Sequence, residues 1–155
     1  MAVLRAYLGP TYWSGGSFRP YGPLIHFGVH SNPWQTSKVT WTARFFVGFN
    51  VGGQPKYTMD DLIALVSRSH APPDATYIAQ HGVFTSPTTR EVVQEEGAQV
   101  IIILGSAGAT PVRVSTFEKK MGELAETICR AMQQEVVIVE IQRNGVVKQS
   151  LWVTQ

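Results

Sequence analysis

Residues 39–51 read VTWTARFFVGFNV, and this stretch decides the fold. Its odd-numbered positions, from Val39 to Val51, are all apolar, whereas the even-numbered positions carry Thr, Arg, Gly and Asn together with Phe46. Successive side chains of a strand point to opposite faces, so this period of two predicts a long strand with one face on the core and one more polar face. The sequence Gly52-Gly53-Gln54-Pro55 then ends the strand.

Two helices are expected after this strand. Thr58 precedes an acidic first turn and apolar residues at helical spacing, which predicts a helix from Thr58 to Ser69 that the prolines at 72 and 73 stop. Ser115 and Glu118 have the spacing of a capping box, which predicts the start of a second helix. Its apolar stripe is Phe117, Met121, Leu124, Ile128 and Met132.

Four further strands are predicted around these helices. They cover residues 76–85, 90–104 with a β-bulge near Glu96-Gly97, 135–142 and 146–154, and Asn144-Gly145 makes the last two a hairpin. The order from 39 to 155 is that of an α+β ferredoxin-like split βαβ domain, with an antiparallel sheet, two helices on one face and an extra C-terminal hairpin strand.

Residues 1–38 differ in composition from this domain. They are rich in Gly, Pro and aromatic residues, which predicts a loop-rich N-terminal arm with one strand around Leu24 to His30. Its rings, such as Trp13 and Trp34, need a surface to rest on, and either the domain itself or a neighbouring subunit supplies that surface. Only 15% of the whole chain is charged, which favours a surface partly covered by another subunit.

These features favour a non-enzymatic interaction or assembly module, most simply a homo-oligomer, with a different protein as the second candidate partner. A ferredoxin-like sheet leaves one face without helices, and apolar groups on that face need a cover. The residues expected to make such contacts are Arg44, Phe46, Trp13, Trp34 and Trp152.

The alternative is a small enzyme or ligand-binding protein in which His81 acts as the acid–base group. The strand that pairs beside His81 carries Glu95 and Glu96, and a histidine within reach of a carboxylate is the minimum for general acid–base chemistry. The competing interpretation of His81 is a sheet residue held by a cross-strand pair.

Several other classes of site are disfavoured by the sequence. His26 and His30 on one strand lie about 13 Å apart, too far to share a metal ion, so no metal and no cofactor are expected. The net charge of +2 makes nucleic acid an unexpected partner, and Arg113 beside the second helix offers only a weak anion site. The single Cys129 favours the cytoplasm, and neither a membrane span nor a secretory signal is predicted.

The composition makes a prediction about mass in solution. Light scattering of the purified protein at micromolar concentration is expected to give a multiple of the 17.1 kDa chain mass. A monomer at these concentrations would contradict the idea that a second copy covers part of this weakly charged surface.

Overall fold

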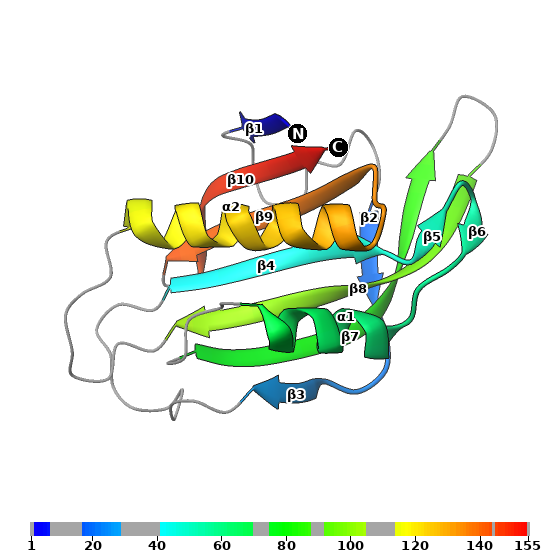
Figure 1. Cartoon of the computed structure of the whole chain (residues 1–155), viewed down its shortest axis with the longest axis horizontal. Coiled ribbons are helices and arrows are strands. Elements are labelled where there is room, and N and C mark those ends of the chain that lie inside the picture. Colours follow the sequence, from blue (N-terminus) through cyan, green and yellow to red (C-terminus); the bar gives the residue numbers. More distant parts are fainter. Residues whose placement is uncertain are drawn as a thin grey trace.

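The computed structural model describes residues 2–6, 17–28, 41–69, 75–87, 92–104, 114–143 and 145–154. These residues form an α+β structure in which α1 (Met59–Arg68) and α2 (Val114–Ala131) lie on one face of a curled, antiparallel sheet (Figure 1). We call this side the helix face and the opposite side the inner face. The strands are β1 (Ala2–Ala6), β2 (Ser17–Pro20), β3 (Ile25–Gly28), β4 (Trp41–Gly48), β5 (Asn50–Val51), β6 (Gln54–Pro55), β7 (Ala75–Pro87), β8 (Val92–Leu104), β9 (Val136–Arg143) and β10 (Val146–Thr154).

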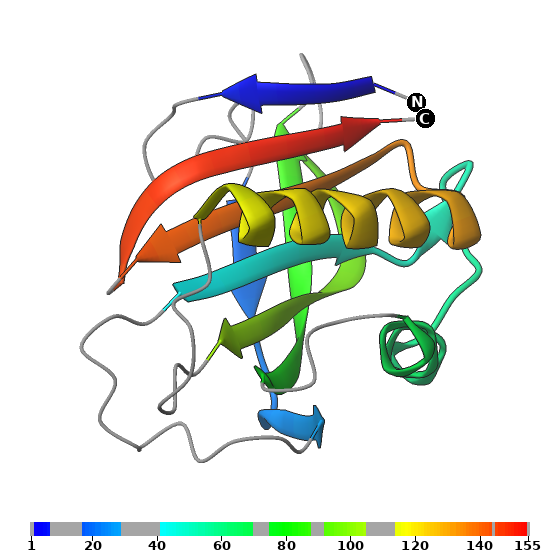
Figure 2. The same cartoon turned by 60° about the vertical axis from the view of Figure 1, so that its left-hand side comes forward.

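The strand order of the main sheet is β1-β10-β9-β4-β8-β7-β2, and β3 also pairs with β7. Each of these pairings is antiparallel. The short strands β5 and β6 form a separate hairpin after β4. Three strands of the first forty residues therefore join the sheet of the same chain, β2 and β3 on β7 and β1 on β10 (Figure 2). The sequence predicted only the strand that corresponds to β3.

The alternating stretch and the first helix form as the sequence predicts. β4 puts Ala43, Phe45 and Val47 on the helix face, fully buried, although its strand ends at Gly48 rather than Val51. Thr58 caps α1 through a capping box, because its hydroxyl accepts from the Asp61 N–H and the Asp61 carboxylate accepts from the Thr58 N–H. The Arg143–Val146 hairpin is also confirmed, with Gly145 at φ 80° in the turn.

Two local predictions are wrong. α2 begins at Val114, so Ser115 is a helical residue and not the residue that caps the helix. No bulge occurs near Glu96-Gly97, because β7 and β8 pair without a register shift from Ala75↔Leu104 to Pro87↔Val92. The glycine that suggested a bulge instead gives room to a ring, since a Cβ on Gly97 would overlap Cε2 of Phe84 and the Val47 carbonyl.

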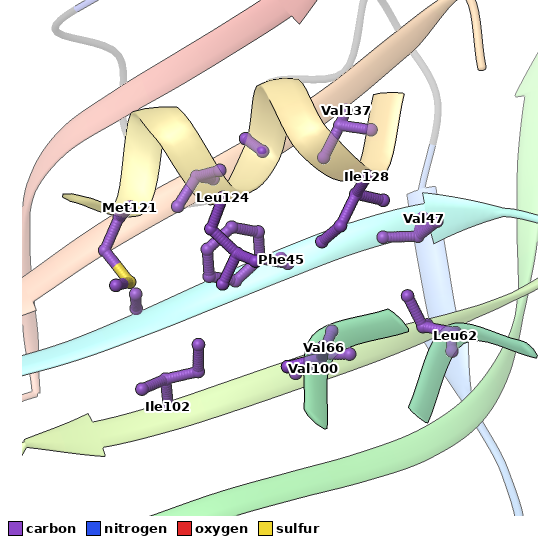
Figure 3. Packing of buried hydrophobic residues seen from close by; sticks show 14 of the residues in the cluster. Phe45, Val47, Leu62, Val66, Val100, Ile102, Met121, Leu124, Ile128 and Val137 are labelled. Carbon is purple, nitrogen blue, oxygen red and sulfur yellow. The ribbon is translucent and has the colours of Figure 1, made fainter. Parts of the chain in front are cut away.

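The main core lies between the helices and the sheet. Phe45 and Val47 of β4 and Val100 and Ile102 of β8 face the helices and are fully buried. Met121 and Ile128 come from α2, and Leu62 and Val66 come from α1 (Figure 3). Burying a side chain of this kind contributes about 1.5–3 kcal/mol relative to leaving it exposed, so this cluster fixes both helices on one face. Among the described residues, no helix is long and apolar enough to cross a membrane.

The sheet curls toward its inner face. The ring of Phe18 in β2 lies 5.3 Å from that of Phe46 in β4, although β8 and β7 separate these strands in the sheet order. Neighbouring strands lie about 4.8 Å apart, so a flat sheet would hold β2 and β4 about 14 Å apart. The curl brings the two rings into contact and leaves Phe46 only 6% exposed.

The fit of rings over glycines makes a prediction about stability. Gly97→Ala is expected to destabilise the fold by about 1–3 kcal/mol, because the new methyl group must displace Phe84 and meets the main chain of β4. Gly122→Ala in α2 is the matched control, since its Cβ would meet only Leu151 Cδ1 at 3.9 Å. That change should stabilise the helix by about 0.5–1 kcal/mol. Urea unfolding measures both, and equal effects would contradict the proposed packing.

Candidate functional site

The register of β7 and β8 separates the three residues that the sequence offered as acid–base candidates. His81 lies opposite Ala98, Val83 opposite Glu96 and Phe84 opposite Glu95. Since side chains alternate along a strand, Glu96 shares the helix face with His81, whereas Glu95 lies on the inner face. Of the two glutamates predicted to accompany His81, Glu96 therefore lies on the same face of the sheet, and Glu95 lies on the opposite face.

On the helix face, Tyr21 links His81 with Glu96. The phenol of Tyr21 donates to Oε2 of Glu96, and its ring stacks on the imidazole with centroids 6.0 Å apart and planes 11° apart. The Tyr21 N–H also donates to the His81 carbonyl at 2.8 Å. The imidazole also meets the ring of Phe49 edge-on at 6.2 Å. These contacts give His81 a packing role between two aromatic rings.

On the inner face, Glu95 lies over Gly48 at the end of β4. Its Oε1 accepts a hydrogen bond from the Asn50 N–H at 2.9 Å, and a Cβ on Gly48 would overlap this carboxylate. Burial raises the pKa of Glu95, the Asn50 N–H opposes the rise, and the negative charge of Glu135 adds to it. A half-buried carboxylate with a raised pKa beside a second carboxylate is a functional-site candidate.

Aromatic rings continue this site across the inner face. Gly48, Gly97 and Gly82 lie side by side in the registers of β4, β8 and β7. The Glu95 carboxylate covers the first glycine, the ring of Phe84 the second and the ring of Phe18 the third. The two rings pack with centroids 4.7 Å apart, and both are partly exposed. The Glu95 carboxylate and the rings of Phe84 and Phe18 therefore lie in one row on the same side of the sheet, which we call the inner-face row.

Gln134 supports the main chain that holds Glu95. It is 5% exposed, and its Nε2 donates to the Asn50 carbonyl at 3.1 Å and to the Met132 carbonyl at 2.9 Å. The Cys129 thiol donates to the Gln134 carbonyl at 3.0 Å and contacts the Val153 carbonyl at 3.7 Å. Sequence reasoning missed Gln134, because a glutamine at a helix end looks like an ordinary exposed residue. Its hydrogen bond to the Asn50 carbonyl shows that it lies beside β5.

Arg44 and Phe46 lie on the inner face but are occupied within the chain. Arg44 pairs across the sheet with Glu140, which is only 4% exposed. Burial raises the pKa of Glu140, and the positive charge of Arg44 opposes that rise. Nε of Arg44 is itself buried without a hydrogen-bond partner. Phe18 packs on Phe46 in the same way, so both residues have partners within the chain.

The remaining predicted contact residues give less information. Trp13, Trp34 and the weak anion candidate Arg113 lie outside the described residues. Trp152 is in β10, opposite Ile138 of β9 and Leu4 of β1. Among the predicted contact residues that the structure describes, Arg44 and Phe46 lie near each other as alternate residues of β4.

The inner-face row suits a small ligand that is both aromatic and positively charged. Partly exposed phenylalanine rings stack against flat ring systems, and a desolvated carboxylate attracts a cation more strongly than it would in water. A carboxylate whose pKa is raised can also accept a proton in a reaction near neutral pH.

Two solved structures are similar to this chain, while no family model and no curated protein matches it. The first is a phage SAM lyase in complex with S-methyl-5'-thioadenosine, with 36% sequence identity, a TM-score of 0.59, and coverage of 75% of this chain and 90% of that chain. The second is a phage SAM lyase in the apo state, with 36% identity, a TM-score of 0.57, and coverage of 74% and 89%. This chain is therefore a member of an enzyme family. It belongs to the phage SAM lyase family.

This membership overturns the leading functional interpretation of the sequence. The prediction of a non-enzymatic, protein-binding assembly module is wrong, and the small-enzyme alternative is the better one. Low charge and aromatic residues do not by themselves distinguish a contact surface from an enzyme. In the structure, the curl of the sheet uses Phe18 to cover Phe46, and Glu140 faces Arg44.

The raised pKa of Glu95 makes a prediction about the pH dependence of stability. The fold favours protonated Glu95, so this contribution to stability is fully present below the unfolded pKa and is lost as the pH rises through the folded value. Glu95→Gln keeps an acceptor for the Asn50 N–H and removes the charge. The variant should therefore be more stable than the parent at neutral pH, and the difference should vanish below about pH 4.

Thermal unfolding at both pH values measures this effect. Glu123→Gln on the exposed side of α2 controls for the loss of one negative charge. A Glu95→Gln variant that is less stable at neutral pH would mean that the fold favours the ionised carboxylate.

Proposed function

We propose that this protein is a SAM lyase that releases S-methyl-5'-thioadenosine from S-adenosylmethionine. The observation that carries the proposal is the 36% identity over 90% of a phage SAM lyase whose structure contains that thioether. The inner-face row supports it independently, because the substrate is an aromatic nucleoside that bears a sulfonium cation.

The bond that breaks follows from the product. Release of the thioadenosine cleaves the bond between sulfur and Cγ of the aminobutyrate chain, and the bonding electron pair goes to sulfur, which changes from a cation to a neutral thioether. As this bond breaks, either the substrate's own carboxylate oxygen bonds to Cγ and closes a lactone, or a base takes a Cβ proton and the electrons of that C–H bond form the Cβ–Cγ double bond of an unsaturated amino acid. Both routes consume positive charge at sulfur, so surroundings of low polarity accelerate either one.

Glu95 is the residue that we assign to the positively charged part of the substrate. Its carboxylate is half-buried, and the Asn50 N–H holds it in place. Among the described residues, no basic side chain contributes to its pKa shift, so its charge is not neutralised. Phe84 is its cross-strand partner, which puts the two Cβ atoms about 5 Å apart. A nucleoside stacked on Phe84 or Phe18 would therefore bring its sulfonium group toward Glu95. His81 and Glu96, on the other face, have no contact with the substrate in this arrangement.

We further propose that residues 39–155 form a ferredoxin-like split βαβ domain with residues 1–38 as an added arm. The strand order β9-β4-β8-β7, with α1 after β4 and α2 after β8, supports this topology. β10 and the three N-terminal strands are then additions at the two sides of the sheet. A cytoplasmic location fits the single cysteine of the chain, Cys129, which is buried.

The activity has a direct test. Purified protein incubated with S-adenosylmethionine should produce S-methyl-5'-thioadenosine, measured by liquid chromatography with mass detection, which also identifies the four-carbon product. Glu95→Gln should lower the rate by about 10²- to 10⁴-fold, because it removes both the charge and the proton acceptor. Glu123→Gln should retain the parent rate.

Two outcomes would contradict the proposal. Failure of the parent protein to form the thioadenosine, with its fold confirmed by circular dichroism, would exclude the lyase activity. A Glu95→Gln variant with the parent rate would leave the activity in place but remove Glu95 from the site.

A further inference from the structure

The turn that follows β2, Tyr21 and Gly22, contacts β7 through His81 on the helix face and through Gln80 on the inner face. Tyr21 lies on the helix face, where its N–H bonds to the His81 carbonyl at 2.8 Å and its ring stacks on the imidazole. The next residue, Gly22, has φ 79° and presents its carbonyl to Nε2 of Gln80 at 2.9 Å. Gln80 in turn accepts from Nε2 of Gln99 at 2.8 Å. The turn is therefore tied to β7 and, through Gln99, to β8.

This turn reaches the strand that carries Glu95. The phenol of Tyr21 donates to the carboxylate of Glu96, the residue next to Glu95 in β8. Because consecutive side chains of a strand point to opposite faces, holding Glu96 from the helix face constrains the main chain from which Glu95 projects on the inner face.

Phe49 and Asn50 connect the same two glutamates from β4. The Phe49 N–H donates to the Glu96 carbonyl at 3.0 Å, and the following Asn50 N–H donates to Oε1 of Glu95 at 2.9 Å. The Phe49 ring lies against His81, on which Tyr21 stacks. Tyr21 thus holds Glu96 directly through its hydroxyl and Phe49 indirectly through the imidazole.

We propose that Tyr21 is a positioning residue for the Glu95 carboxylate and that it acts through Glu96 and His81 from the opposite face of the sheet. The effect of Tyr21 on the reaction rate rests on the proposed function, whereas its effect on the position of Glu95 rests on geometry alone. Tyr21 is 45% exposed, so its hydroxyl is a poor candidate for a stabilising core contact. Its bond to Glu96 is better explained by the placement of the neighbouring carboxylate.

Tyr21→Phe is the test, because it keeps the ring on His81 and removes only the hydroxyl. Glu95 should then lose part of its alignment with the Asn50 N–H. In the parent protein, this N–H partly offsets the rise in the pKa of Glu95 that burial causes. The pKa of Glu95, followed by carbon NMR of its carboxyl group, should therefore rise in the variant. Lyase kcat should fall about tenfold with KM nearly unchanged, and the acid limb of the pH profile should move to higher pH.

The control is Tyr57→Phe, which also removes one tyrosine hydroxyl bond, from Tyr57 to the Ala131 carbonyl at 3.2 Å. It should leave both the pKa of Glu95 and kcat at the parent values. Glu96→Gln keeps an acceptor for Tyr21 and should stay within about threefold of the parent, whereas Glu96→Ala should match Tyr21→Phe. The double variant Tyr21→Phe with Glu96→Ala should be no worse than either single change.

The possible failures are distinct. If the parent protein has no lyase activity, the NMR titration of Glu95 still decides whether Tyr21 positions this carboxylate. If the lyase is active but Tyr21→Phe changes neither the titration nor kcat, the positioning role is wrong and the proposed function stands. Multiplicative losses in the double variant would also overturn the inference, since they would show that Tyr21 and Glu96 act separately.

Discussion

The unbroken antiparallel pairing of β7 with β8 is the constraint on which the rest of the structure depends. Each strand has 13 residues, and their register runs through the bend of the sheet without a shift. A slip by one residue would exchange the two faces of a strand. Glu95 would then leave the inner face, and Glu96 would lose its place beside His81. The register therefore puts the Glu95 carboxylate on one face of the sheet and the Tyr21 and His81 contacts of Glu96 on the other.

Glycines allow this long ladder to bend without interruption. Gly48, Gly97 and Gly82 form a row across β4, β8 and β7, and these three positions of the inner face have no Cβ atom. The side chains of Glu95, Phe84 and Phe18 then lie close to the main chain at these glycines and fill the concave side of the curled sheet.

The sequence predicted the parts of the structure that depend on local chemistry. The alternation of β4, the cap at Thr58 and the turn at Gly145 each follow from a few adjacent residues. The start of α2 and the role of Gly97 could not be predicted in this way. Gly97 has the same local sequence whether it forms a bulge or makes room for Phe84, and only the pairing with β7 decides between them.

The candidate site was partly visible in the sequence. The sequence offers Glu95, Glu96 and His81 together, but which glutamate shares a face with His81 depends on which residue of β7 faces which residue of β8, and the register gives that place to Glu96. Asn50, Gln134 and Tyr21 carry no chemical signal of their own in the sequence. Their contribution comes from main-chain, amide and phenol hydrogen bonds between segments far apart in the chain, which no local pattern records.

Cys129 gives the protein a built-in chemical reporter. A thiol reacts as its thiolate, and burial raises the pKa of Cys129, so alkylating reagents reach it only when the end of α2 separates from the sheet. Its sulfur bonds to the carbonyl of Gln134, the residue that holds Asn50 beneath Glu95. Because the chain has one cysteine, the rate of its labelling under native conditions measures how often this supporting segment opens.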